Sequence, residues 1–403
     1  MKSALLFTAL LLGALETARA DEPFPETFDE ASKAGYSFSK ETIQMFRGDA
    51  RRAYYGRGKL GRGKMKVRWK FKTRELIDER IKAGGKPLVW TGTGWSGQAT
   101  VVGDMVYVGS VDGWLYALRT KDGKKRWETR VGRSIKCSMG VWSETIFVGS
   151  RSHRMDAYDR RTGKKRWSIP TPGRDIDVAP IVFDGVLYFA SENGGIYAAD
   201  PKTGKVQWKY QTTADVESSP TIVGHRLYVA NYDGHLYALD RRNGTLIWTF
   251  ETGDDTDTTA AYWNGRLYLG SENSWVYAID AETGELIWKR KTHGGVWSSA
   301  AIADGKVIVG SDDGHLYAFD PDDGRVLWKY KADAGIWASP VVVDGQVVVG
   351  DWAGVIHRVD AATGKGIGRF QTGNYVISTA VIVDGAIYVG SRDGFFYAFD
   401  VAP

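Results

Sequence analysis

Cysteine is nearly absent from this sequence, since Cys137 is the only one in 403 residues. A chain with one cysteine forms no internal disulfide and cannot attach haem through a Cys-x-x-Cys-His segment, so its stability must come from its core. No histidine is paired with Cys137 by a recognisable spacing. We therefore interpret Cys137 as a small buried hydrophobic residue rather than a nucleophile or redox group.

The sequence also has no apolar run long enough to cross a bilayer, which needs roughly 20 residues. One shorter apolar stretch extends from Leu5 to about Leu15, follows Lys2 and precedes Ala18-Arg19-Ala20. This arrangement predicts a secretory signal peptide, residues 1–20, with cleavage after Ala20. We expect an exported, soluble protein of the periplasm without a transmembrane segment. No lipid anchor is expected, because no cysteine lies near the cleavage site.

Recognisable catalytic and metal-binding patterns are missing as well. The six histidines show no His-x-x-x-His spacing, and no glycine-rich phosphate loop or Ser, His and acid constellation stands out. Asp254, Asp255 and Asp257 lack the alternating acids and closing Glu of an EF-hand loop, which favours a solvated acidic loop over a calcium site. The sequence predicts no catalytic residue, no metal and no cofactor.

Charge is distributed unevenly around a formal net value of +5. The segment 47–86 is crowded with Lys and Arg, whereas the functional positions described below are largely acidic. The basic segment is interpreted as a solvated arm, with peripheral contact to anionic lipid or to an acidic partner as the alternative. Nucleic acid is not expected as a partner of an exported protein.

Aromatic residues and glycine are abundant, and they recur with a period. A turn of the form x-Gly-x-x-x-Trp appears about every 40 residues, with its tryptophan at Trp127, Trp167, Trp208, Trp248, Trp288 and Trp328. The next copy has Gly368 in the Trp position. A partner segment, Tyr-Ala-x-Asp, has Asp156 and His357 in place of tyrosine in two copies. A repeat of this length indicates a solenoid or a propeller.

Each period holds four strand-like runs separated by Asp-Gly or Asn-Gly turn signals, which is typical of a propeller blade. The last Tyr-Ala-x-Asp strand has no outer strand after it, and residues 66–73 supply one. We predict an all-β fold, an eight-bladed β-propeller of four-stranded antiparallel blades, with the ring closed by this N-terminal outer strand. The expected domains are the signal peptide 1–20, a partly ordered N-terminal arm 21–60 and one propeller 61–403, with an insertion at about 74–89 that forms a helix on the rim.

Most repeated residues are assigned to structure. The outer-strand tryptophans recur in nearly every blade, so we expect them to pack between neighbouring sheets. The aspartates before the turns, such as Asp200, Asp240, Asp280 and Asp360, are expected to cap those turns through their side chains. Small, mostly hydroxylic residues, such as Ser219 and Ser299, occur near the start of each first strand and predict a narrow, wettable tunnel.

Two variable positions in each blade are expected to open on one face of the ring, called here the top face. The first is the start of the innermost strand, and the second is the variable residue of the hairpin Gly-Ser-x-Asp-Gly. Aromatic residues gather in one arc of the ring and acids in another. The candidate ligand- or partner-binding residues are Trp95, Lys136, Asp177, Glu192, Glu217, Tyr232, Asp257, Glu272, Trp297, Asp312, Trp337, Trp352 and Arg392. Indole faces beside carboxylates suit a sugar, a cation or a peptide strand. The alternative is that the tryptophans plug the channel mouth.

The segment from Tyr197-Ala198-Ala199-Asp200 to Trp208 resembles the repeat of the pyrroloquinoline-quinone (PQQ) propeller superfamily, and the resemblance extends from about Val67 to Asp400. That superfamily contains quinoprotein alcohol dehydrogenases and BamB-like proteins, which are non-catalytic scaffolds of outer-membrane barrel assembly in the periplasm. The dehydrogenases typically carry a disulfide between adjacent cysteines, calcium ligands and a catalytic Asp. This chain cannot form that disulfide, and its acidic arc opposes a polyanionic quinone.

The resemblance therefore favours a BamB-like scaffold that binds a protein or peptide partner, in outer-membrane protein assembly. The missing lipid-attachment cysteine departs from the BamB group. Two alternatives remain: a PQQ-dependent alcohol or sugar dehydrogenase, which would use PQQ and calcium, and a carbohydrate-binding propeller.

Overall fold

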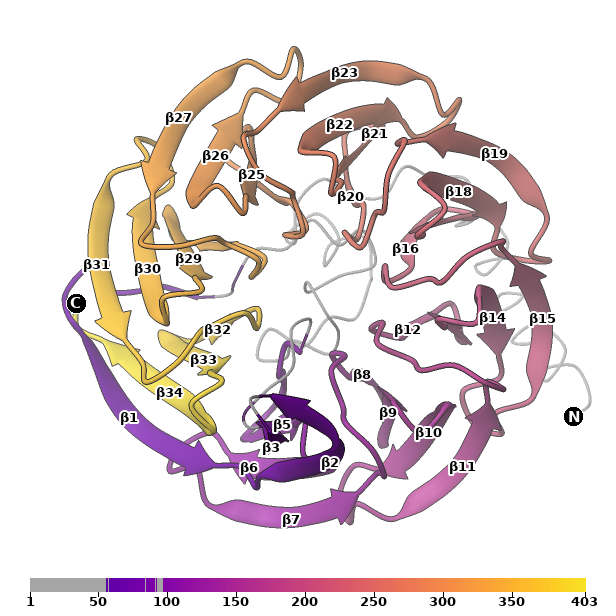
Figure 1. Ribbon diagram of the computed structural model, residues 1–403, viewed down its shortest axis with the longest axis horizontal. Helices are drawn as coiled ribbons and strands as arrows, with labels where there is room; N and C mark the ends of the chain where they lie inside the picture. Colours follow the sequence, from indigo (N-terminus) through magenta and orange to yellow (C-terminus); the bar gives the residue numbers. More distant parts are fainter. Residues whose placement is uncertain (1–55, 57, 84, 91, 93–96) are drawn as a thin grey trace, which may run out of the picture.

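A computed structural model describes residues 56, 58–83, 85–90, 92 and 97–403 of the chain. Over these residues the protein is a ring of eight four-stranded antiparallel sheets, as predicted. In each sheet the shortest strand lies nearest the ring axis and the last strand forms the rim (Figure 1). We number the blades 1 to 8 from the sheet that begins with β4.

The strands of blades 1 to 4 are β4 (Thr100–Val102), β5 (Met105–Gly109), β6 (Trp114–Arg119) and β7 (Lys125–Arg130); β8 (Gly140–Trp142), β9 (Thr145–Ser150), β10 (Arg154–Asp159) and β11 (Lys165–Pro170); β12 (Ile181–Phe183), β13 (Val186–Ala190), β14 (Gly195–Ala199) and β15 (Val206–Gln211); and β16 (Thr221–Val223), β17 (Arg226–Ala230), β18 (His235–Asp240) and β19 (Leu246–Glu251).

The strands of blades 5 to 8 are β20 (Ala261–Trp263), β21 (Arg266–Gly270), β22 (Trp275–Asp280) and β23 (Leu286–Lys291); β24 (Ala301–Ala303), β25 (Lys306–Gly310), β26 (His315–Phe319) and β27 (Val326–Lys331); β28 (Val341–Val343), β29 (Gln346–Gly350), β30 (Val355–Asp360) and β31 (Gly366–Gln371); and β32 (Val381–Val383), β33 (Ala386–Gly390), β34 (Phe395–Val401) and β1 (Met65–Lys72).

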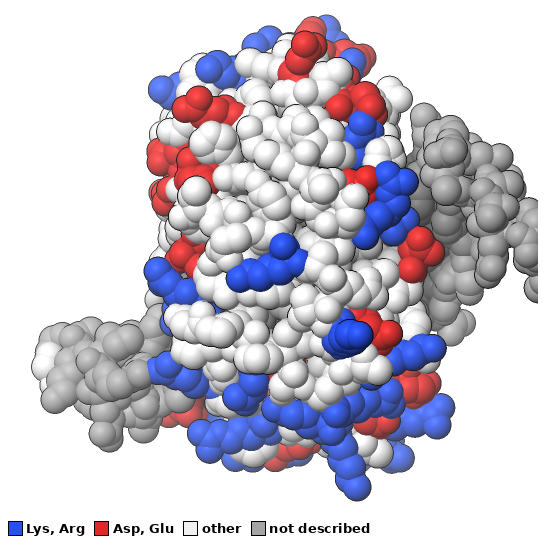
Figure 2. All heavy atoms as spheres, turned by 90° about the vertical axis from the view of Figure 1, so that its right-hand side faces the viewer, with Lys and Arg blue, Asp and Glu red and all other residues white. Residues whose placement is uncertain are grey.

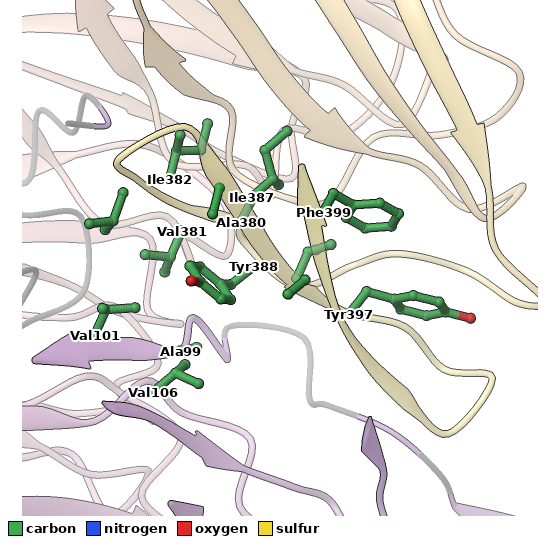
Figure 3. Close-up of a cluster of buried hydrophobic side chains, with 14 of the residues drawn as sticks. Ala99, Val101, Val106, Ala380, Val381, Ile382, Ile387, Tyr388, Tyr397 and Phe399 are labelled. Carbon is green, nitrogen blue, oxygen red and sulfur yellow. The ribbon is translucent and has the colours of Figure 1, made fainter. Parts of the chain in front are cut away.

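The N-terminal strand closes the ring, which confirms the prediction from the strand count. β1 pairs antiparallel with β34 from Met65 opposite Val401 to Lys72 opposite Phe395, with a bulge between Val67 and Trp69. Buried side chains of blade 8 and blade 1 pack together beside this closure, among them Tyr388, Phe399 and Val106 (Figure 3). The first and last strands of the propeller are thereby paired in one blade, which closes the ring.

The insertion after β1 is a hairpin, and the predicted rim helix is wrong. β2 (Leu76–Ala83) pairs antiparallel with β3 (Lys86–Trp90), and Gly85 in the turn has φ +80°. Gly85 supplies the positive φ that a tight turn needs, which the charged composition of the segment obscured.

The repeated tryptophans and aspartates have the structural roles expected of them. Trp208 donates its indole N–H to the carbonyl oxygen of Arg241 in the next blade, at 3.0 Å. A Cβ added to Gly244 would lie 2.7 Å from the Trp208 ring, so the turn packs flat against the indole. The carboxylate of Asp200 accepts hydrogen bonds from the backbone N–H of Lys202 and Thr203, each at 2.8 Å. These residues join blade to blade and cap the turns.

The small hydroxylic residues near the ring axis do not line an open tunnel. Ser219, Thr259 and Ser299 are at most 4% exposed. The Thr259 hydroxyl oxygen accepts a hydrogen bond from the Ser219 N–H at 3.0 Å, and the Ser299 hydroxyl accepts one from the Thr259 N–H at 2.9 Å. Each hydroxyl thus satisfies a buried backbone donor of the preceding blade, forming a belt of interblade hydrogen bonds.

The rim changes character around the ring. The outer strands β7 and β11 begin with the exposed pairs Lys125-Arg126 and Lys165-Arg166, whereas β19 and β23 begin with exposed Leu246-Ile247 and Leu286-Ile287. Figure 2 shows this rim, with basic side chains gathered toward the lower end of the view and a broad uncharged surface across its middle. Among the described residues, none belongs to a helix with the length and apolarity of a membrane span.

Part of the basic segment 47–86 lies among the described residues. Arg62, Arg68 and Arg74 form ion pairs with Asp360, Asp400 and Glu128 of the propeller. Contact of this segment with anionic lipid stays a prediction. The signal peptide and most of the predicted N-terminal arm lie outside the described residues.

Candidate functional site

Blades 2 to 8 each contribute two side chains to the top face, in two slots. The first-strand slot precedes the innermost strand, and the hairpin slot lies between the second and third strands. A hairpin-slot residue contacts the first-strand slot of the next blade, as Glu272 contacts Trp297 25 residues further on. Trp95, the predicted first-strand residue of blade 1, lies outside the described residues.

Aromatic side chains of blades 6, 7 and 8 form a continuous group, called here the aromatic arc: Trp297, Trp337, Trp352 and Tyr375. The ring centroids are 3.9 Å apart between Trp297 and Trp337 and 4.4 Å apart between Trp337 and Trp352, both edge to face. Trp352 stacks on Tyr375 at 4.6 Å and 23°. Tyr375 is not among the candidate residues predicted from the sequence.

Two indoles of the aromatic arc are held by carboxylates of the preceding blade. The indole N–H of Trp297 donates to Glu272 Oε1, and that of Trp337 donates to Asp312 Oδ1, each at 2.7 Å. Charge-assisted bonds of this kind fix the ring planes. The indole N–H of Trp352 is buried and has no acceptor among the described residues. The predicted aromatic and acidic positions are therefore brought together.

Acids of blades 4 and 5 share one phenol. Tyr232 donates its hydroxyl to Asp257 Oδ2 at 3.3 Å. Burial, the negative charge of Glu217 and that of Glu272 raise the pKa of Asp257 well above its usual range. Burial and the carboxylates of Asp257 and Glu217 also raise the pKa of Tyr232, so the phenol stays a donor.

Basic groups enter the site from blades 2 and 8. Lys136 forms an ion pair with Asp177 at 2.9 Å, and Arg151 pairs with Asp175 at 2.7 Å. Arg151 and Asp175 were not among the predicted site residues, although Arg151 occupies the hairpin slot. Burial lowers the pKa of Arg392, the hairpin-slot residue of blade 8.

Glu192 and Glu217 meet at the junction of blades 3 and 4, in the hairpin and first-strand slots. Glu192 is 7% exposed, and its carboxylate has no hydrogen bond or ion pair within the part of the chain that the structure describes. Burial, followed by the carboxylates of Asp177, Glu217 and Asp175, raises the pKa of Glu192 to about 8. Burial and Asp177 raise the pKa of Glu217 as well. Glu217 accepts a hydrogen bond from the Tyr232 phenol, whereas Glu192 has no donor among the described residues.

The described residues contain no cluster of three or more His, Cys, Asp or Glu side chains arranged to hold a metal ion. Cys137 is 1% exposed and donates its thiol to the carbonyl of Gly149, and burial raises its pKa to about 12. A thiol of this kind is neutral at physiological pH and is not a nucleophile.

An eight-bladed propeller with this repeat, one buried cysteine and a top face of paired acids and indoles defines the class as a PQQ-like β-propeller. Comparison with family models identifies the family within this class. The model described as outer membrane protein assembly factor BamB matches residues 66–181, 151–261 and 255–403, and the chain belongs to this family.

Individual relatives are more distant. A polyvinylalcohol dehydrogenase of Pseudomonas sp is 30% identical over 146 residues, which are 29% of this chain and 23% of that protein. The outer membrane protein assembly factor BamB of Burkholderia pseudomallei is 27% identical over 131 residues, 31% of this chain and 34% of that protein. The chain thus spans about a quarter to a third of the length of these relatives.

A solved structure gives the same fold over most of the chain. The crystal structure of BamB from Moraxella catarrhalis superposes with a TM-score of 0.67 at 21% identity, covering 82% of this chain and 98% of that one. At this identity the likeness shows the fold alone.

Proposed function

We propose that this chain is an exported, non-catalytic scaffold that binds a protein or peptide partner through its top face, in the assembly of outer-membrane proteins. The observation that carries the proposal is the BamB family match, which spans all eight blades. Relatives named as BamB support the role in assembly. Residues 1–20, with the features of a signal peptide, support export.

The top face is the preferred site because its residues differ from blade to blade while the rest of each blade repeats. Half-buried indoles can pack against apolar side chains of a partner, and the carboxylates beside them can accept hydrogen bonds from a peptide backbone. Tryptophan and tyrosine are enriched among the residues that dominate protein interfaces. A catalytic site would instead be recognised by a nucleophile, a general base or a metal.

Deleting the gene in the host organism tests the proposal. We expect the amount of folded β-barrel protein in the outer membrane to fall, and to recover with the wild-type gene but not with the double variant Trp337→Ala/Glu217→Gln. Glu285→Gln, an exposed residue of a turn between β22 and β23, is the matched control and should restore it. Unchanged barrel protein after deletion, or full recovery with the folded double variant, would reject the proposal.

The second candidate is a PQQ-dependent alcohol or sugar dehydrogenase, which the polyvinylalcohol dehydrogenase relative favours. The described residues do not fit the quinone. The top face presents carboxylates in successive blades where a polyanionic group would lie, and its ammonium group, Lys136, already pairs with Asp177. Adding PQQ and calcium to the purified protein tests this alternative. A stoichiometric absorbance change with dye reduction in the presence of an alcohol would establish the enzyme and overturn the scaffold.

A further inference from the structure

The junctions between neighbouring blades offer an internal comparison at the top face. Three successive junctions hold a donor and an acceptor across the two slots. They are Tyr232 with Asp257, Glu272 with Trp297 and Asp312 with Trp337. In each case the two residues are 25 positions apart, so the slots are geometrically equivalent.

The junction of blades 3 and 4 breaks this rule. Glu192 and Glu217 stand in the same pair of slots, again 25 positions apart, and both side chains are carboxyl groups. Glu192 is more than nine-tenths buried and has no bonded partner among the described side chains. A buried carboxylate without a donor is costly, and proteins retain such groups chiefly where they act.

We propose that the junction of blades 3 and 4 binds an organic cation, the ammonium group of a lysine side chain on the partner, which donates to Glu192, the carboxyl group that has no donor among the described residues. The proposal deepens the function proposed above and rests on it for the choice of the top face. The aromatic arc on the other side of the mouth then receives the apolar neighbours of that lysine.

Charge around the junction supports an organic cation. The charged groups facing Glu192 are Asp175, Asp177, Glu217, Lys136 and Arg151. Lys136 and Arg151 form their ion pairs with Asp177 and Asp175. Their charges also act on Glu192, but neither forms an ion pair with it among the described residues. An ammonium group with three donors can bridge two carboxylates, and it needs no ligand set of the kind that a metal ion requires.

Proton release on binding is a measurable effect that a purely structural role of Glu192 would not produce. The raised pKa of Glu192 keeps this carboxyl largely protonated at pH 7 in the free protein. A cation favours the ionised form, so binding must release a proton from the junction. Substituting Glu192 removes the proton source without removing the fold.

The test is calorimetric titration of the full chain with tetralysine at pH 7 and 0.15 M salt, in phosphate and in Tris, whose different ionisation enthalpies report the protons released. We expect binding with net proton release by the wild type and by Glu285→Gln. Glu192→Gln should lose the proton release and bind at least tenfold more weakly. Tetralysine acetylated on its side chains should not bind.

Two further probes separate the sources of the cation. Spermidine that binds with the same proton release as tetralysine supports the ammonium site and assigns it to a polyamine as well as to a peptide. Calcium that releases the proton and displaces tetralysine overturns the proposal in favour of a metal site. Equal tetralysine affinity of the wild type and folded Glu192→Gln overturns it too.

These results are distinguishable from those of the gene deletion. Tetralysine binding that depends on Glu192, together with unchanged barrel assembly, rejects the scaffold role and keeps the cation site. Defective assembly with the folded double variant, together with no tetralysine binding, keeps the scaffold and rejects the cation site.

Discussion

Blade 7 and the junction of blades 3 and 4 both depart from the repeat, in different ways. Blade 7 has His357 where most other blades have Tyr, Arg358 where the others have Ala, and Gly368 where its neighbours have Trp. The junction replaces a donor and an acceptor by Glu192 and Glu217. Four of these five changes place a polar side chain where the repeat has a different residue, and the fifth, Gly368, removes a side chain.

In blade 7, another segment of the chain replaces the contact that is lost at Gly368. The Trp of a blade normally donates to a carbonyl in the next blade, as Trp328 does to Ala361 33 residues on. Counting the same distance from Gly368 reaches Val401, the last residue of β34, rather than a turn. The guanidinium of Arg358 instead donates to the carbonyl oxygens of Gly63 and Gly61, at 2.6 and 2.7 Å. The segment before β1 thus takes the place of the missing turn.

The segment before β1 is held by Gln346 of blade 7 and by the core of the closing blade. Gln346 accepts from Arg358 at 2.6 Å and donates to the carbonyl of Leu60 at 2.7 Å. Leu60 is 1% exposed in the core of the closing blade. His357 bridges Asp351 of blade 7 and Tyr330 of β27 in blade 6. Every departure in blade 7 therefore has an internal partner, whereas the one at Glu192 has none among the described residues. A departure from a repeat indicates function only after the chain's own ends have been considered.

Removing the Arg358 side chain, which holds the segment before β1 against blade 7, should have the largest effect on stability. Arg358→Ala removes the guanidinium that donates to the half-buried carbonyl oxygens of Gly61 and Gly63 and to the side-chain oxygen of Gln346. We expect a loss of about 3–5 kcal/mol in the free energy of unfolding, as for other buried charged groups.

Urea unfolding followed by tryptophan fluorescence measures this loss. Arg62→Ala is the matched control, since Arg62 belongs to the same segment but its ion pair with Asp360 is exposed, and it should cost at most about 1 kcal/mol. Similar midpoints for the two variants would show that the segment is not held by Arg358.

A smaller loss is expected from Asp351→Asn. Asp351 accepts from His357 at 2.9 Å and from the Val355 N–H at 2.8 Å. Burial opposes ionisation, but these hydrogen bonds outweigh it and lower the pKa of Asp351. The variant should lose about 2 kcal/mol at pH 7, because an amide N–H₂ then faces a donor.

The pH dependence follows from the direction of that shift. A carboxyl whose pKa is lower in the folded state stabilises the protein above its unfolded value of about 3.9, and this stability is lost as the pH falls through the folded value. The difference between the wild type and Asp351→Asn should therefore shrink below about pH 4. Asp313→Asn in blade 6, where Tyr317 is the donor, is the matched variant and should lose a comparable amount. A neutral Asp351→Asn beside a destabilised Asp313→Asn would contradict the comparison.

The fold could be predicted from the sequence because the repeat is local and its closure is a matter of counting. Trp328 and Gly324 are each set by contacts within a fixed distance along the chain, so their spacing reveals the blade. The missing strand was found because β34 needs a partner and residues 66–73 match one. The hairpin after β1 was missed because its charged strands lack an apolar alternation, although the glycine pair at 84 and 85 marked a turn.

The candidate site could be predicted only as a set of positions. The repeat places Glu272 and Trp297 in their slots. The hydrogen bond between them, however, joins two blades and depends on how far one sheet is rotated against the next. The Ser219 and Thr259 hydroxyls were misread for the same reason, because their acceptor role faces a neighbouring blade rather than the channel. Arg358 was not singled out, since its partners precede the first strand.

The smallest effect, with the opposite sign, is expected at the junction of blades 3 and 4. Glu192→Gln should stabilise the protein by about 1 kcal/mol at pH 8, because the amide donates to Glu217 and carries no charge. The pKa of Glu192 is about 8 in the fold and roughly 4.3 in the unfolded chain, so the native state binds more protons between these values and the wild type loses stability as the pH rises through them. The gain from Glu192→Gln should therefore grow from pH 5 to pH 8, as measured by urea unfolding. Glu285→Gln should show no such trend. A Glu192→Gln variant less stable than the wild type at pH 8 would mean that Glu192 has an internal donor, as the residues of blade 7 do.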